Sequence, residues 1–180
     1  GQKYDSENSD KIYVISPLKD IPPFASGFKS YSIYGTFSIV VTDENQLRGI
    51  GYNEYCEISG SLPHEVINHY EPFEIKDDQD RTLVPKSAAC GQNYSLYLLE
   101  KPEDSTKSIL AYSYAHITSN YPIILNTGNL NPIALYAGYE NSAAIDDQGH
   151  IIFIPKKVEK TTLLNSFSLP GNEKAIGDAI

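Results

Sequence analysis

The sequence lacks tryptophan and methionine altogether and contains only two cysteines among its 180 residues. Because methionine is absent, Gly1 is not a translation start, and we expect the chain to be processed, tagged or excised from a longer one. Cys56 and Cys90 are too few for a disulfide framework in a chain of this size. Their scarcity favours a reducing compartment, cytoplasmic or nuclear, and of the two we favour the cytoplasm.

Basic residues are also scarce, with 14 lysines and arginines against 23 aspartates and glutamates and a net charge of −9. Binding to nucleic acid depends largely on basic side chains that replace the counterions of phosphates, so this balance works against a nucleic-acid partner. No apolar run approaches the roughly 20 residues that a membrane-spanning helix needs. The sequence therefore predicts neither nucleic acid nor membrane as a partner.

Helical periodicity is almost absent, since no window keeps an apolar stripe at positions i, i+3, i+4 and i+7. The nearest candidate for a helix is Leu62–Tyr70. Runs rich in Ile, Val, Tyr and Thr, which favour strands, recur along the chain. They are Lys11–Ile15, Tyr31–Val41, Ser95–Leu99, Ser108–Ala115, Tyr121–Leu125, Ser142–Ile145, Ile151–Ile154 and Leu163–Leu169. These runs predict an all-β protein.

A motif of glycine, a short spacer, serine and an apolar strand occurs three times. Its members are Gly35 with Ser38, Gly91 with Ser95, and Gly138 with Ser142. The serines are 57 and 47 residues apart, which is enough chain for about four short strands with their turns, the content of one propeller blade. In the second repeat the polar stretch Glu100–Lys107 lengthens the turn after the strand, a change that an exposed surface loop tolerates.

Two segments carry a more specific pattern. Ala89–Ser95 is Ala-Cys-Gly-Gln-Asn-Tyr-Ser, and Gly51–Ile58 is Gly-Tyr-Asn-Glu-Tyr-Cys-Glu-Ile. The first resembles the Cys-Gly-x-x-His-Ser strand of the regulator of chromosome condensation family, with Tyr94 in place of His. The second resembles the family's Gly-x-Asn-x-Tyr-Gly-Gln-Leu-Gly segment, with Cys56 in place of Gly. The resemblance implies a β-propeller of that type, of which this chain holds about three blades.

The resemblance also implies a division of the chain. We expect three repeats at about 21–62, 63–126 and 127–167, with 168–180 starting a fourth repeat and 1–20 supplying a strand of a preceding blade. Propellers of this family usually close with seven blades. Because three isolated blades leave outer faces and strand edges open, we expect the remaining blades in the same full-length chain.

The repeated residues are expected to be structural. The glycines should permit a backbone conformation or a close approach that a Cβ would block, and the serines should hydrogen-bond backbone between strands or blades. These positions are Gly35, Ser38, Gly91, Ser95, Gly138 and Ser142. Cys90, at the entry to the second repeat's strand, is expected to be buried.

No convergent set of catalytic or metal-binding residues is present. His64 and His69 are five residues apart, whereas the two histidines of a zinc-binding helix are spaced by four. Cys90 with His116 or His150 would act as a thiol nucleophile and base only if Cys90 were accessible. We therefore predict a protein that is not an enzyme, with no catalytic residues, no metal and no cofactor.

Recognition by exposed loops is the function that these observations favour. The loops expected to be exposed are Tyr52–Tyr55, Glu100–Lys107 and Pro63–Arg81, and a solvated rim is the alternative interpretation of the same stretches. The candidates for partner binding are Tyr52, Glu54, Tyr55, His69 and Tyr70. We predict a scaffold for protein–protein interaction. The family resemblance supplies a second hypothesis, guanine-nucleotide exchange on a Ran-type small GTPase.

Overall fold

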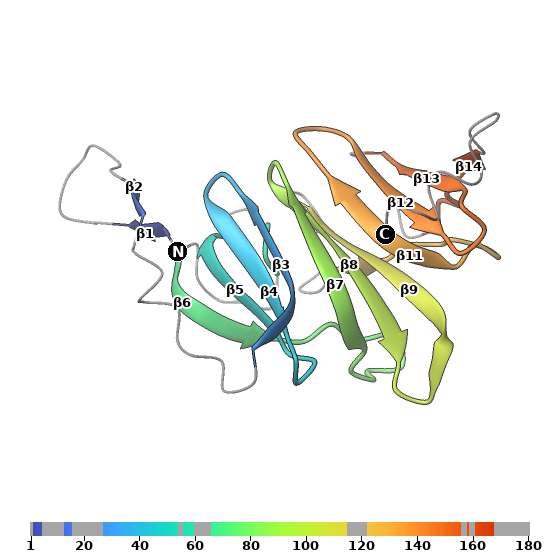
Figure 1. Ribbon diagram of the computed structural model, residues 1–180, viewed down its shortest axis with the longest axis horizontal. Helices are drawn as coiled ribbons and strands as arrows, with labels where there is room; N and C mark the ends of the chain where they lie inside the picture. The colour runs from blue at the N-terminus through green and yellow to red at the C-terminus, as the bar shows by residue number, and fades with distance from the viewer. Residues whose placement is uncertain are drawn as a thin grey trace.

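A computed structural model of the chain describes residues 2–4, 13–15, 27–53, 56–59, 66–114, 122–155, 158 and 161–167. These residues form strands, bridges, turns and bends, and no helix occurs among them. They build three antiparallel sheets of four strands each and one sheet of two strands (Figure 1). The prediction of an all-β chain with three propeller blades is confirmed.

Each four-stranded sheet uses four consecutive strands, so each sheet is one blade. Blade I contains β3 (Phe28–Tyr34), β4 (Phe37–Thr42), β5 (Leu47–Tyr52) and β6 (Val66–Phe73). Blade II contains β7 (Val84–Gly91), β8 (Tyr94–Lys101), β9 (Asp104–Tyr114) and β10 (Ile123–Ile124). Blade III contains β11 (Pro132–Ala137), β12 (Ser142–Asp146), β13 (Ile151–Ile154) and β14 (Ser166–Phe167). The small sheet pairs β1 (Gln2–Tyr4) with β2 (Tyr13–Ile15).

The blades stand side by side in chain order, from blue to orange in Figure 1. Their first strands are neighbours, because β3 lies beside β7 and β7 lies beside β11. The later strands of each sheet spread away from this common side. This radial arrangement of sheets is that of a propeller.

The core lies between the faces of neighbouring sheets. On β8, Tyr97 and Leu99 pack with Ile39 of blade I, whereas Leu96 packs with Ile152 of blade III. Successive side chains of a strand point to opposite faces, so a strand between two sheets needs apolar residues at every position. This requirement explains why the middle strands of the repeats are continuous apolar runs.

The helix candidate Leu62–Tyr70 is wrong, because the described part of this segment belongs to strand β6. The ladder between β5 and β6 shifts register, so that Gly49 pairs with Glu71 and Gly51 pairs with Ile67. This bulge leaves Ile67 and Tyr70 buried with two exposed residues between them, a spacing that imitates a helical turn. The expected loop Pro63–Arg81 is a loop only in part, because 66–73 belong to β6 whereas 74–81 lie in the connection to β7.

The expected loop Glu100–Lys107 is also wrong. Both strands of the hairpin continue through it, and only Pro102 and Glu103 form the turn between β8 and β9. The pairing passes from Glu100 opposite Ser108 to Lys101 opposite Asp104, which leaves three residues of β9 unopposed. The extra length is therefore used for a longer hairpin with a bulge.

Repeat and sheet boundaries differ at one place. Because β6 pairs with β5, residues 66–73 lie in the sheet of the first blade, although the sequence repeat starting near 63 assigns them to the second unit. The start of a fourth repeat at 168–180 lies outside the described residues. That residues 1–20 supply a strand of a preceding blade stays a prediction.

Candidate functional site

The segment after β5 is held by one side chain. Asn53 is buried, and its Oδ1 accepts hydrogen bonds from the backbone nitrogens of Ile58 (2.9 Å) and Ser59 (3.1 Å). Its Nδ2 donates to the carbonyl oxygen of Ser59 at 3.0 Å. Cys56 has a φ of 61°, in the left-handed region that favours glycine. Glycine is also the residue at this position in the Gly-x-Asn-x-Tyr-Gly-Gln-Leu-Gly segment that Gly51–Ile58 resembles. Asn53 thus fixes a short buried turn.

Blade II binds this turn through three hydroxyl groups. Ser113 Oγ donates to the carbonyl oxygen of Cys56 at 2.5 Å. The hydroxyls of Ser95 and Tyr97 donate to the next two carbonyl oxygens, those of Glu57 and Ile58. The donors come from β8 and β9, and three successive carbonyls accept them. These bonds connect blade I to blade II and satisfy backbone groups that are buried away from water.

Cys90 takes part in a second connection between the same blades. Its backbone nitrogen donates to Ser32 Oγ at 2.9 Å, and its Sγ lies 3.5 Å from the carbonyl oxygen of Ser32. The side chain is 3% exposed, and burial raises the pKa of the thiol to about 12. A neutral, enclosed thiol is not a nucleophile.

Tyr94 connects blade II to blade III. Its Oη lies 3.1 Å from the carbonyl oxygens of both Gly138 and Asn141 and accepts a hydrogen bond from the nitrogen of Gly138 at 3.1 Å. The nitrogen of Gln92 also donates to the carbonyl oxygen of Gly138, at 3.2 Å. The β7–β8 turn therefore holds the β11–β12 turn in place.

The three repeated serines are all buried but do not share one acceptor. Ser95 donates to backbone, as described above, and Ser142 Oγ donates to the carbonyl oxygen of Ile154 at 3.0 Å. Ser38 Oγ instead lies 3.0 Å from the hydroxyl of Tyr70. The prediction that this serine hydrogen-bonds to backbone is therefore wrong.

The three repeated glycines also differ. Gly35 has a φ of 50°, and a Cβ on Gly91 would lie 2.0 Å from the ring of Tyr94. Gly138 has neither feature, because the nearest atom to its Cβ position is the carbonyl oxygen of Asn141 at an ordinary 3.6 Å. The prediction that glycine is needed for its backbone conformation or for a close approach is therefore wrong at Gly138.

Of the candidates for partner binding, the structure describes Tyr52, His69 and Tyr70, which lie on the neighbouring strands β5 and β6. Tyr70 is only 3% exposed and bonds to Ser38, so its expected place in an exposed loop is wrong. His69 is exposed on β6, with Nε2 3.3 Å from Glu71 Oε1. Tyr52 is half-buried at the end of β5. Glu54 and Tyr55 lie outside the described residues.

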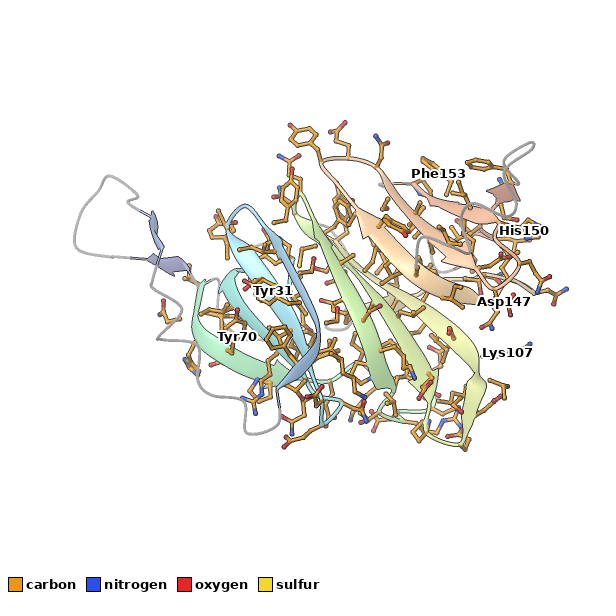
Figure 2. The ribbon with its side chains drawn as sticks, in the orientation of Figure 1. Tyr31, Tyr70, Lys107, Asp147, His150 and Phe153 are labelled. Atoms are coloured by element: carbon orange, nitrogen blue, oxygen red, sulfur yellow. The ribbon has the colours of Figure 1, made fainter. Side chains whose placement is uncertain are left out.

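The two ends of the blades differ in chemistry. One end, named here the Asp77 end, carries the turns 43–46, 74–83, 102–103 and 147–150. There Arg81 binds Asp77 and also Glu103 of the next blade, at 2.5 and 2.7 Å. Asn131 Nδ2 likewise bonds to Asp147 Oδ2 at 2.9 Å. Figure 2 shows Lys107, Asp147 and His150 along one side of the molecule. The basic side chains Lys76 and Arg81 at this end are thus ion-paired with Asp80, Asp77 and Glu103.

The opposite end, named here the Tyr139 end, carries the turns 35–36, 92–93 and 138–141. Glu140 is the single charged residue in these three turns. Tyr139 is 62% exposed, more than any other large apolar side chain described. Sequence reasoning missed Tyr139, because it lies in the variable spacer between the glycine and serine of the third repeat.

No family model and no curated protein matches the sequence. Among solved structures, human WBSCR16 is similar at a TM-score of 0.59 and 13% identity, over 83% of this chain and 43% of that chain. Prp20p from Saccharomyces cerevisiae is similar at 0.57 and 15%, over 81% and 39%. Yeast RCC1 (Prp20), in its complex with Kap60, is similar at 0.52 and 17%, over 71% and 32%. The fold is that of an RCC1 propeller. The chain spans less than half the length of each of these proteins, and at these identities the likeness shows the fold alone.

Two hollows open on the RCC1-type blades near the Asp77 end. One, of about 530 Å³, lies between the β4–β5 turn and the β6–β7 connection. The other, of about 690 Å³, is lined by Ile109, Ile124 and Leu125 and also by Arg81 and Lys101.

The described residues contain no cluster of three or more His, Cys, Asp or Glu arranged for a metal. No helix in the described part of the chain is long and apolar enough to cross a membrane.

Replacing Asn53 by alanine should destabilise the RCC1-type fold strongly. The change leaves two backbone nitrogens and one carbonyl oxygen buried without their partner, at a cost of about 2–4 kcal/mol. Urea unfolding measures this loss. Asn68→Ala is the matched control, because Asn68 is exposed on β6 and should change stability by less than about 0.5 kcal/mol. Equal effects of the two changes would contradict the assignment.

The glycines offer a second matched pair. Gly91→Ala should lower the free energy of unfolding by about 1–3 kcal/mol, because the new methyl group displaces a buried Tyr94 ring whose hydroxyl is hydrogen-bonded to blade III. Gly138→Ala should be tolerated within about 0.5 kcal/mol, since its surroundings leave room for a Cβ. Thermal unfolding of both variants checks this, and a reversed order would show that Tyr94 moves freely.

The Arg81 contacts predict a pH dependence. Hydrogen bonds from the Arg81 side chain lower the pKa of Asp77 from 3.8 to about 2. A lowered folded-state pKa stabilises the fold above the unfolded value, and this contribution is lost as the pH falls from 3.8 to about 2. Wild type should therefore exceed Arg81→Gln in stability above pH 4 and approach it near pH 2. Asp77→Asn should remove the same pH dependence, and a difference independent of pH would contradict it.

Proposed function

We propose that the chain is a protein-binding part of an RCC1-type propeller and that its partner docks on the Tyr139 end. The observation that carries the proposal is the contrast between the two ends. At the Asp77 end, Arg81 is ion-paired with Asp77 and Glu103. The turns 35–36, 92–93 and 138–141 at the Tyr139 end contain one charged residue, Glu140, and expose a tyrosine.

Tyr139 has the properties of an interface anchor. Tyrosine offers a large amphipathic surface with little side-chain entropy to lose, and it is enriched among residues that dominate binding energy. Its neighbour Gly138 is bonded through both its nitrogen and its carbonyl oxygen to the β7–β8 turn. The tyrosine is thus presented on a backbone that is already ordered, which lowers the cost of binding.

The rest of the molecule is consistent with a protein partner. The net charge of −9 disfavours nucleic acid and suits a partner with a basic or mixed surface. We place the protein in the cytoplasm, as its two free cysteines favour. Because the chain spans 32–43% of the similar structures, we expect further blades in a longer full-length chain.

Tyr139→Ala should weaken partner binding about tenfold without affecting the fold. Immobilised wild-type chain is used to capture proteins from cells, and the captured set is compared quantitatively with that of the variant. At least one protein should be retained about tenfold less by Tyr139→Ala, since a hot-spot side chain contributes this much or more. Asp78→Ser, a change of an exposed residue at the Asp77 end, should leave capture unchanged.

Two results would overturn the proposal. Capture of no protein by the folded wild-type chain would contradict a binding function. Equal loss of capture in Tyr139→Ala and Asp78→Ser would show that binding does not depend on the Tyr139 end.

Guanine-nucleotide exchange is the second candidate. The solved structure of Prp20p is described together with its binding to Gsp1p and histones, so one protein of this fold binds such partners. On this alternative a propeller face accelerates nucleotide release from a Ran-type small GTPase without a cofactor. Faster release of labelled GDP in the presence of the chain would favour it over a passive scaffold.

A further inference from the structure

The hollow of about 690 Å³ arises because strands β9 and β10 differ in length. β9 has 11 residues, whereas β10 has two and pairs only with residues 111 and 112. The chain leaves the sheet directly afterwards, where the nitrogen of Leu125 donates to the carbonyl oxygen of Leu110. Ile109 therefore has no partner on β10 and is partly exposed. Together with Ile124 and Leu125 it gives the hollow an apolar lining.

Two connections complete the hollow, and hydrogen bonds hold both of them in place. In the β6–β7 connection, Asp77 Oδ1 accepts a hydrogen bond from the nitrogen of Arg81 at 3.1 Å. Arg81 in turn binds Glu103 of the β8–β9 turn at 2.7 Å. After β10, the carbonyl oxygen of Asn126 accepts a hydrogen bond from the nitrogen of Leu164 at 3.0 Å. A hollow whose walls are already ordered costs a ligand little to fill.

The lining contains four charged side chains, and Lys101 is the one that a ligand can pair with. Asp77 and Arg81 bind each other at 2.5 Å, and Asp78 already interacts within the chain. Asp104, opposite Lys101 in the hairpin, accepts hydrogen bonds from its own strand instead. The ammonium group of Lys101 forms no ion pair or hydrogen bond with any residue that the structure describes. The complement of this positive charge is an anionic group.

We propose that this hollow binds a small carboxylic acid with an apolar body, its carboxylate beside Lys101 and its body on the three aliphatic side chains. Burying the body removes apolar surface from water, and the lysine selects the anionic group. Gln79, Asn126 and Thr161 also line the hollow and are of residue types that donate hydrogen bonds to a carboxylate. The volume lies within the range of small-molecule sites, roughly 300–1,000 Å³.

The hollow does not depend on where the chain begins or ends. It belongs to blade II and to the connections beside it, and blade II has a neighbouring blade on each side. A further blade would pack against blade I or blade III and would leave the hollow open. The hollow is also separate from the Tyr139 end, because residues 77–81 of the Asp77 end form part of its lining. The proposed site therefore does not rest on the proposed function.

The experiment titrates the ¹⁵N-labelled chain with sodium octanoate at neutral pH and follows the chemical shifts of the backbone amides. The shifts should saturate with a Kd on the order of 1 mM and should be largest around Ile109, Ile124 and Asn126. Hexanoate, which is shorter by two CH₂ groups, should bind about tenfold more weakly, because less apolar surface leaves water.

A matched pair of lysine variants tests the charge. Lys101→Gln should weaken octanoate binding about three- to fivefold, the effect of losing one partly exposed ion pair. Lys107→Gln, an exposed position of the same hairpin that does not line the hollow, should bind octanoate like wild type (Figure 2). Tyr139→Ala should also bind octanoate like wild type, so failure of this site and failure of the proposed function are distinguishable. Circular dichroism verifies the fold of each variant.

Three results would overturn the inference. The first is a titration in which the amides around the hollow do not shift. The second is equal affinity of Lys101→Gln and Lys107→Gln, which would show that the carboxylate does not lie beside Lys101. The third is a set of shifts as large at the exposed Tyr31 and Phe153 as in the hollow, which would show general adsorption to apolar surface.

Discussion

The arrangement of the blades depends on the hydrogen bonds of the buried backbone N–H and C=O groups that follow β5. Asn53 folds this backbone into a turn, and the turn presents three carbonyl oxygens in succession to the next sheet. Hydroxyls of Ser95, Tyr97 and Ser113 occupy all three. An unpaired buried carbonyl costs about 1–3 kcal/mol, so the position of blade II is fixed by polar groups as well as by apolar packing.

Burial on both faces explains most of the remaining sequence. Blade II lies between two others, and β8 is buried along most of its length. Its alternate residues divide between the two neighbouring sheets, with Tyr97 in the cluster shared with blade I and Leu96 in the cluster shared with blade III. Among the described residues, blades I and III each pack against blade II and expose apolar side chains, such as Tyr31 on β3 and Phe153 on β13.

The sequence predicts the blades well because their strands repeat. Ser38, Ser95 and Ser142 lie on the second strand of each sheet, as the repeat requires. Prediction is wrong where a strand departs from regular pairing. The bulge in β6 produces helix-like spacing and buries Tyr70, and the bulge in β9 turns an apparent loop into a long hairpin. Both bulges depend on how each strand pairs with its neighbour, and the local periodicity of the sequence gives no information on that register.

The candidate site was less predictable for a related reason. The exposure of Tyr139 depends on the position of the β11–β12 turn, and that position is held by hydrogen bonds between Gly138 and Tyr94 of blade II. The central claim, that Asn53 acts by presenting carbonyl acceptors to blade II, is tested most directly by a double-mutant cycle of Asn53→Ala with Tyr97→Phe in urea unfolding. The account predicts a coupling energy of about 0.5–3 kcal/mol, because the Tyr97 hydroxyl is worth little once the turn is lost. Additive effects of the two changes would contradict it.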